Sequence, residues 1–123
     1  MKQHDLHAMT VESLVESFLA NALEQYEAEL IDAYAKYNRL FRRMRLLENE
    51  LQSRPGDQRH ALLPLCDHRN AHVRLRAAIA TLAIAPEKAR QTLQIIVDRN
   101  EYPDAADARG MLRALDQGTY TPT

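Results

Sequence analysis

The fold is decided by one stretch of the sequence, residues 67–78, which reads DHRNAHVRLRAA. The amide side chain of Asn70 can accept hydrogen bonds from the free N–H groups at a helix start, so a helix is predicted to begin just after it. The apolar residues that follow recur at helical steps through Val73, Leu75, Ala78, Ile79 and Leu82. The stretch therefore predicts a helix that carries small alanines.

Proline and glycine mark the helix ends on the C-terminal side of this stretch. Pro86 is predicted to open a helix that continues from Glu87 to Asp98, because the missing N–H of proline does no harm at a first helical position. A last helix is predicted from about Asp104 to Gln117, with Gly118 in the usual C-terminal capping position. On the other side, residues 54–57 (RPGD) predict a turn, and a short helix is expected from Arg59 to Leu65.

The first 54 residues contain neither glycine nor proline, and two long helices are predicted there. Thr10 is expected to cap the first, which begins at Val11. A single helix from Val11 to Arg54 would be about 66 Å long, more than the diameter of a small domain, so a break is placed in residues 24–27 (EQYE). Residues 1–9 are expected to be flexible. One apolar stripe is predicted on each helix, formed by Val11, Leu14, Val15, Phe18 and Ala22 and by Leu30, Tyr34, Tyr37, Phe41, Met44 and Leu51.

The fold class predicted from these patterns is all-α, a stack of about six helices within one domain, residues 1–123. β-Branched and aromatic residues are sparse, and they nowhere alternate with polar residues over the length of a strand. An offset of 33 residues aligns Leu62 with Ile95, Arg76 with Arg109 and Ile79 with Leu112. Helix pairs that repeat at such a spacing stack side by side, so the second half is predicted to form a small α-solenoid.

Residues 67–78 resemble the second helix of HEAT-type repeats, in which an Asn or Pro opens the helix, a Val-Arg pair follows and alanines allow close packing. Residues 30–123 more widely resemble a family of small bacterial proteins known as a domain of unknown function with HEAT-like helices. The blocks that carry the resemblance are 38–41 (NRLF), 56–59 (GDQR), 70–86, 114–118 (ALDQG) and 122–123 (PT). The resemblance implies a HEAT-like right-handed stack and a bacterial cytoplasmic setting, and it supplies no catalytic residues.

Composition excludes several broad classes of protein. The chain is 46% hydrophobic and 27% charged, which is typical of a globular protein rather than a disordered one. A formal charge of −1 argues against non-specific binding of the whole chain to nucleic acid or membranes, and no apolar run is long enough to cross a bilayer. The one cysteine, Cys66, has no partner for an internal disulfide, which fits a cytoplasmic location.

Charge is strongly segregated along the chain. Residues 1–35 carry one base and seven acids, whereas residues 36–76 carry ten bases and four acids. On the helix that contains Tyr37 and Phe41, the face opposite the apolar stripe is predicted to hold Lys36, Arg39, Arg42, Arg43 and Leu46. Arginine is enriched at protein interfaces and recognises carboxylates with a planar fork. This face is the predicted binding surface for one partner protein with an acidic surface.

Two alternatives to this interpretation stay open at the level of sequence. Like charges three and four residues apart destabilise an isolated helix. Acids of the first helix, such as Glu12, Glu16 and Glu24, are expected to compensate the basic residues within the chain, or water solvates them, unless a partner protein binds them. Some HEAT-like proteins bind DNA, so a nucleic-acid-associated protein is the alternative function. It is disfavoured because no aromatic residues alternate with the exposed arginines to stack on bases.

Cys66, His68 and His72 are residue types that bind zinc, and His60 lies upstream. A structural zinc site normally has four ligands, so no metal or other cofactor is expected and Cys66 is interpreted as a small buried residue. Cysteine catalysis needs a thiol, a base and an orienting carboxylate in a triangle, which adjacent residues in sequence do not readily form. An uncharacterised enzyme is accordingly kept as the second alternative function, after a nucleic-acid-associated protein. Arg74 is interpreted as part of the scaffold, reaching Asp67 or the preceding repeat.

The function predicted from sequence is that of a non-catalytic protein-binding module. Small single-domain helical-repeat proteins of bacteria often serve as cognate inhibitors, including immunity proteins that neutralise a toxin. The charge segregation and this analogy predict a cognate inhibitor of a bacterial partner protein. The identity of the partner and the oligomeric state are not encoded in any pattern of the sequence.

Overall fold

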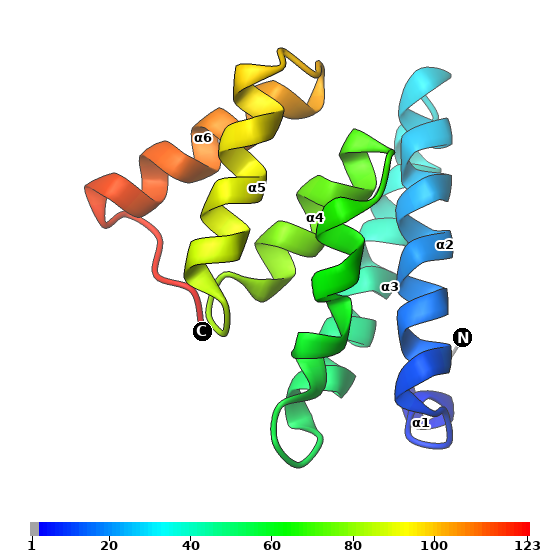
Figure 1. The fold of residues 1–123 in the computed structure, drawn as a ribbon. Helices are drawn as coiled ribbons and strands as arrows, with labels where there is room; N and C mark the ends of the chain where they lie inside the picture. The colour runs from blue at the N-terminus through cyan, green and yellow to red at the C-terminus, as the bar shows by residue number, and fades with distance from the viewer. Residues whose placement is uncertain (1–2) are drawn as a thin grey trace. The chain divides into compact units, whose positions relative to one another are not determined.

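The computed structural model describes residues 3–123, and every regular element in them is helical (Figure 1). Six α-helices confirm the all-α prediction, and no strand occurs among the described residues. One 3₁₀ helix, η1, lies between the third and fourth α-helices. The elements in chain order are α1 (Gln3–Leu6), α2 (Val11–Leu30), α3 (Tyr34–Ser53), η1 (Gln58–Asp67), α4 (Ala71–Thr81), α5 (Pro86–Asp98) and α6 (Asp104–Gln117).

The contacts of the chain group into two compact units, Met1–Ala61 and Leu62–Thr123. The first unit holds α1, α2 and α3, and the second holds α4, α5 and α6. No helix among residues 3–123 is long and apolar enough to cross a membrane.

The first unit is built on the pairing of α2 with α3. Thr10 caps α2 as predicted, since its hydroxyl oxygen accepts a hydrogen bond from the backbone N–H of Ser13 at 3.0 Å. The helices are joined by three residues, a link so short that they run antiparallel. Both contribute fully buried side chains to the core: Leu14, Phe18, Leu47 and Leu51.

The predicted break within residues 24–27 is wrong, because α2 continues to Leu30. In the helix, Glu24 and Glu27 point to solvent while Gln25 between them is buried, so the polar stretch is one exposed face rather than a loop. The chain turns at residues 31–33 instead, where Asp32 adopts a positive φ of 55°. Aspartate reaches this left-handed conformation more easily than most residues, and no glycine or proline marks the turn.

The segment before α2 makes specific contacts although residues 1–9 were expected to be flexible. Leu6 is 1% exposed, and its carbonyl oxygen accepts a hydrogen bond from Nη2 of Arg54 at 2.9 Å. Nδ1 of His7 lies 2.7 Å from Oε1 of Glu50, and the other carboxylate oxygen, Oε2, accepts a hydrogen bond from Nε of Arg54. Residues 1 and 2 lie outside the described part of the chain.

The predicted turn after α3 is confirmed, but the helix that follows differs in type and length. Gly56 and Asp57 both have positive φ, 80° and 52°, as a tight turn at these residues requires. The next element, expected as a helix from Arg59 to Leu65, is a 3₁₀ helix of 10 residues. It contains Pro64, which has no N–H to donate and so disfavours a continuous α-helix.

The second unit contains α4, α5 and α6 with the helix ends that the sequence predicts. Oδ1 of Asn70 accepts from the backbone N–H groups of His72 and Val73, Pro86 is the first residue of α5, and Gly118 ends α6 with a φ of 72°. Figure 1 shows α5 between α4 and α6, and it packs on both. Fully buried alanines allow this close approach: Ala77, Ala78, Ala89, Ala105 and Ala108.

Candidate functional site

Helix α3 presents a row of cations on its solvent face. Lys36, Arg39, Arg42 and Arg43 are exposed as the sequence predicts, and Leu46 is half-buried beside them. Arg45 is exposed as well, but it lies nine residues after Lys36, two and a half helical turns, and so projects from the other side of α3. The side chains of Lys36, Arg39, Arg42, Arg43 and Leu46 are called here the basic face.

The bases of the basic face have no partners within the described chain. None of Lys36, Arg39, Arg42 or Arg43 makes an ion pair or a side-chain hydrogen bond with any of residues 3–123. Like charges at three- and four-residue spacing repel one another, and Lys36 also lies in the first turn of α3, where the helix dipole disfavours a cation. The basic face is therefore an uncompensated concentration of positive charge.

The acids of α2 do not compensate this charge, contrary to one expectation from the sequence. Glu12, Glu16 and Glu24 are exposed, and they form no ion pair among the described residues. The two carboxylates of α3 do have partners. Glu50 is buried and binds His7 and Arg54, and Glu48 also makes an interaction. Within the described residues, no carboxylate therefore pairs with the cations of the basic face.

A cluster of exposed apolar side chains adjoins the N-terminal end of the basic face. Leu30 is 65% exposed, Ile31 75% and Tyr34 67%, and they are called here the apolar turn. The sequence placed Leu30 and Tyr34 in a buried stripe, which is wrong, because they flank the turn where both helices of the pair end. The Tyr34 hydroxyl donates a hydrogen bond to Oδ1 of Asp32 at 3.1 Å, which raises the pKa of the phenol.

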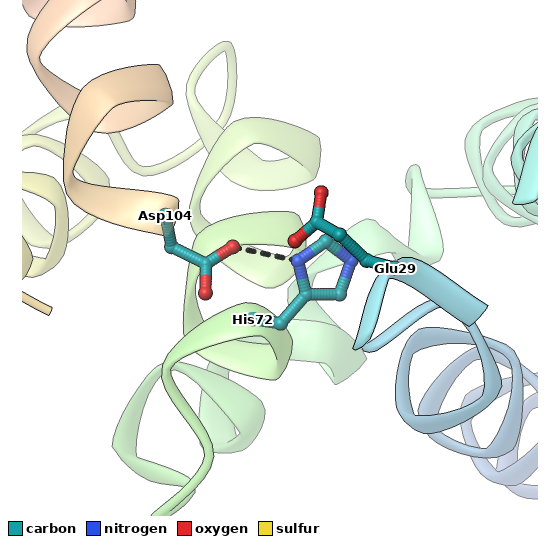
Figure 2. Close-up of side chains that lie close together, drawn as sticks. All are labelled: Glu29, His72 and Asp104. Atoms are coloured by element: carbon teal, nitrogen blue, oxygen red, sulfur yellow. Dashed lines mark hydrogen bonds and ion pairs between the residues drawn. The ribbon is translucent and has the colours of Figure 1, made fainter. Parts of the chain in front are cut away.

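Cys66, His68 and His72 each have a different partner. In Figure 2, Nδ1 of His72 faces Oδ1 of Asp104, 2.7 Å away, and both side chains are buried. Nδ1 of His68 accepts the backbone N–H of Asn70 at 3.0 Å. The three side chains therefore do not converge on one point as ligands or as a catalytic set.

The Cys66 thiol is unsuited to act as a nucleophile. It is 3% exposed, and burial raises its pKa, which hydrogen bonds with Thr92 and Thr81 offset only in part. A thiol whose pKa lies above its ordinary value is protonated at neutral pH, whereas the thiolate is the reactive form. The interpretation of Cys66 as a small buried residue agrees with its surroundings.

Arg74 is buried in the second unit, and of the two alternatives predicted for it, Asp67 or the preceding repeat, the pairing with Asp67 is wrong. Its two Nη atoms donate to the two carboxylate oxygens of Glu101 at 2.7 Å each, and its Nε donates to the carbonyl of His68 at 2.6 Å. Asp67, the partner expected from sequence, instead accepts from Nζ of Lys88 at 2.8 Å. The side chain of Arg74 thus holds the backbone of residues 68–69 and the carboxylate of residue 101 together, which is a structural role.

The Arg74–Glu101 pair predicts a loss of stability in acid. Hydrogen bonds from Arg74 hold the pKa of Glu101 below its ordinary value of 4.5. The stabilisation is complete above that ordinary value and disappears as the pH falls through the lower pKa of the folded state. We expect Glu101→Gln to lower the melting temperature at about pH 7 and to match the unaltered protein at about pH 2.

Thermal unfolding followed by circular dichroism across this pH range measures the difference. Asp98→Asn is the matched control, since Asp98 is exposed and accepts only an amide of Gln94. It should leave the melting temperature nearly unchanged throughout. A deficit of Glu101→Gln that persists undiminished in acid contradicts the assignment of this pH dependence to Glu101.

Comparison with known proteins adds a family and a related structure. The model of a domain of unknown function, DUF2019, matches residues 12–116. The crystal structure of the protein RPA1889 from Rhodopseudomonas palustris CGA009 is similar, with 46% sequence identity and a TM-score of 0.94. The similarity covers 96% of this chain and 98% of that one. None of the curated proteins matches the chain.

Proposed function

The chain belongs to the DUF2019 family, whose description names no activity, and from its own surface we propose that it is a non-catalytic module that binds an acidic partner protein. The observation that carries the proposal is the basic face, a group of exposed cations that form no ion pair or side-chain hydrogen bond with residues 3–123. The recognition surface is the basic face together with the apolar turn.

The apolar turn distinguishes a protein partner from a simple polyanion. Protein interfaces combine an apolar or aromatic anchor with arginines and a polar rim, and the anchor is buried on binding. Leu30, Ile31 and Tyr34 provide that anchor, since each exposes more than half of its surface to water. The guanidinium groups next to it provide forks for carboxylates on the partner.

A nucleic acid fits this surface less well. The α2 helix that packs against α3 exposes Glu12, Glu16, Glu24 and Glu27 within the same unit. A phosphate chain longer than the basic face would approach these carboxylates and be repelled, whereas a compact acidic patch on a protein would not. Among the residues that the structure describes, Tyr34 alone is a mostly exposed aromatic ring next to the cations, so successive nucleobases have no stacking platform.

A HEAT-like stack and a role as a cognate inhibitor remain parts of this proposal. The stack is supported by the packing of α5 on both α4 and α6, by the buried alanines, and by the 33-residue offset that relates η1 and α4 to α5 and α6. The inhibitor role is supported by the surface alone: an exposed, charged and partly apolar patch on a rigid helix pair binds a partner without any chemistry of its own.

The test is a charge reversal on the basic face. Arg39→Glu/Arg42→Glu should abolish capture of the partner from a lysate of the cells that encode the chain, because it replaces attraction with repulsion. Its melting temperature should stay nearly unchanged, because neither arginine pairs with any residue in the part of the chain that the structure describes. Arg113→Glu is the control, since Arg113 is an exposed arginine of α6 with no ion pair among the described residues.

Purified partner and variants then quantify the effect by isothermal titration calorimetry. Two reversed charges at an interface are expected to weaken binding by at least about tenfold each, and Arg113→Glu by less than about twofold. Ile31→Ser should weaken binding as well. If the partner bound through charge alone, this variant would bind with unchanged affinity. Capture of nucleic acid alone, or of proteins that bind the reversed variant equally well, would refute the proposal.

A further inference from the structure

The second unit contains a pocket of about 430 Å³ on the side where α5 meets the segment before α4. A pocket of this size takes one small molecule. Its lining comes from residues 66–69 and 74 on one side and from α5 and Glu101 on the other: Lys88, Gln91, Thr92, Ile95 and Arg99. Neither the basic face nor the apolar turn contributes to it.

The charges that line the pocket are unequal. Four cationic side chains, Arg69, Arg74, Lys88 and Arg99, share it with two carboxylates, Asp67 and Glu101. Both carboxylates are already engaged, Glu101 by the two Nη atoms of Arg74 and Asp67 by Nζ of Lys88. Arg69 and Arg99 are exposed and make no side-chain hydrogen bond or ion pair within residues 3–123, so two positive charges are left over.

His68 adds a further hydrogen-bond donor to the pocket. His68 accepts the N–H of Asn70 through Nδ1, so the neutral imidazole carries its hydrogen on Nε2. That N–H has no hydrogen-bond partner among the described residues. The amide of Gln91 can donate or accept, so the charged groups decide the choice of ligand, and they favour a negative ligand that brings acceptors.

The wall that holds these donors is rigid. Arg74 is 7% exposed, and besides Glu101 it binds the carbonyl oxygens of His68 at 2.6 Å and Arg69 at 3.3 Å. These bonds fix the backbone from which the His68 and Arg69 side chains project. Binding of a ligand therefore orders the side chains of Arg69 and Arg99 but does not have to order the backbone of residues 68–69.

We propose that this pocket binds a small molecule with at least two oxyanionic charges, such as a phosphate ester or a polycarboxylate. The guanidinium groups of Arg69 and Arg99 bind its oxyanions, because this fork matches both phosphate and carboxylate. Lys88 can become a third contact to the ligand if it leaves Asp67. Its pair with Asp67 is exposed, 41% and 71% for the two side chains, and such pairs exchange partners at little cost.

The full chain is titrated with sodium pyrophosphate and, separately, with sodium citrate at constant ionic strength, and two-dimensional ¹H–¹⁵N spectra are recorded. Saturable shifts should appear at the backbone amides of the pocket, residues 66–69, 88–92, 95, 99 and 101. Tighter binding of pyrophosphate would identify the natural ligand as phosphorylated, and tighter binding of citrate as a polycarboxylate.

Four variants separate a built site from general charge attraction. Arg69→Gln and Arg99→Gln should each raise the dissociation constant by about tenfold, and Arg113→Gln, outside this pocket, by less than about twofold. Asp67→Asn should lower the dissociation constant, because it removes the carboxylate that competes for Lys88. Shifts that do not saturate, or an Arg113→Gln variant that weakens binding as much as Arg69→Gln does, would overturn the proposal.

Discussion

Replacing Arg74 with methionine should lower the free energy of unfolding by about 3–5 kcal/mol, as expected when one partner of a buried ion pair is removed. Glu101 would lose both of its hydrogen bonds from Arg74, and the carbonyl groups of His68 and Arg69 would lose their donor. The loss has two physical sources, an unpaired carboxylate that is only 25% exposed and backbone acceptors without partners.

Urea denaturation measures this change, with Arg90→Met as the matched control. Arg90 forms an ion pair with Asp116 at 2.9 Å, but its side chain is 43% exposed and that of Asp116 is 69% exposed. Exposed pairs contribute little, so the control should change the free energy of unfolding by less than about 1 kcal/mol. An equal loss in both variants would show that Arg74 is no more than a surface ion-pair partner.

The second large effect is expected in the core of the first unit. Leu47→Ala should lower the free energy of unfolding by about 2–5 kcal/mol, since Leu47 is fully buried and its removal leaves a cavity between α2 and α3. Leu30→Ala makes the same chemical change on the same helix pair, at a side chain that is 65% exposed. It should change stability by less than about 0.5 kcal/mol.

These two leucines also separate folding from binding. Leu30→Ala removes part of the apolar turn and should weaken partner binding in the calorimetric titration while leaving the urea midpoint in place. Leu47→Ala should shift the midpoint and, at a temperature where the protein is still folded, bind the partner with nearly unchanged affinity. A stable Leu47→Ala variant would mean that the α2–α3 pair is packed less tightly than the structure indicates.

Helix ends that depend on local chemistry could be predicted from sequence. Thr10 and Asn70 cap their helices through side-chain oxygens, Pro86 opens α5, and Gly118 ends α6, because each effect acts within one turn of the residue that causes it. The exposed cations of α3 were predicted for the same reason, since helical periodicity alone places them opposite the apolar stripe.

Features that depend on contacts between distant residues could not be predicted. The turn at Asp32 has no glycine or proline, so the sequence predicts the break in the polar residues 24–27, which are in fact part of the continuous helix α2. The pairing of Arg74 with Glu101 spans 27 positions, and that of Lys88 with Asp67 spans 21. The pocket exists only after these pairs form, and no motif in the sequence marks it.

The burial of the single cysteine has a practical consequence for spectroscopy. A protonated thiol inside the second unit reacts slowly with maleimides, so the natural chain already serves as a silent background for labelling. A cysteine introduced on the basic face or at the rim of the pocket would carry a fluorophore to that position alone. Each of the two surfaces can then report its own occupancy without removal of Cys66.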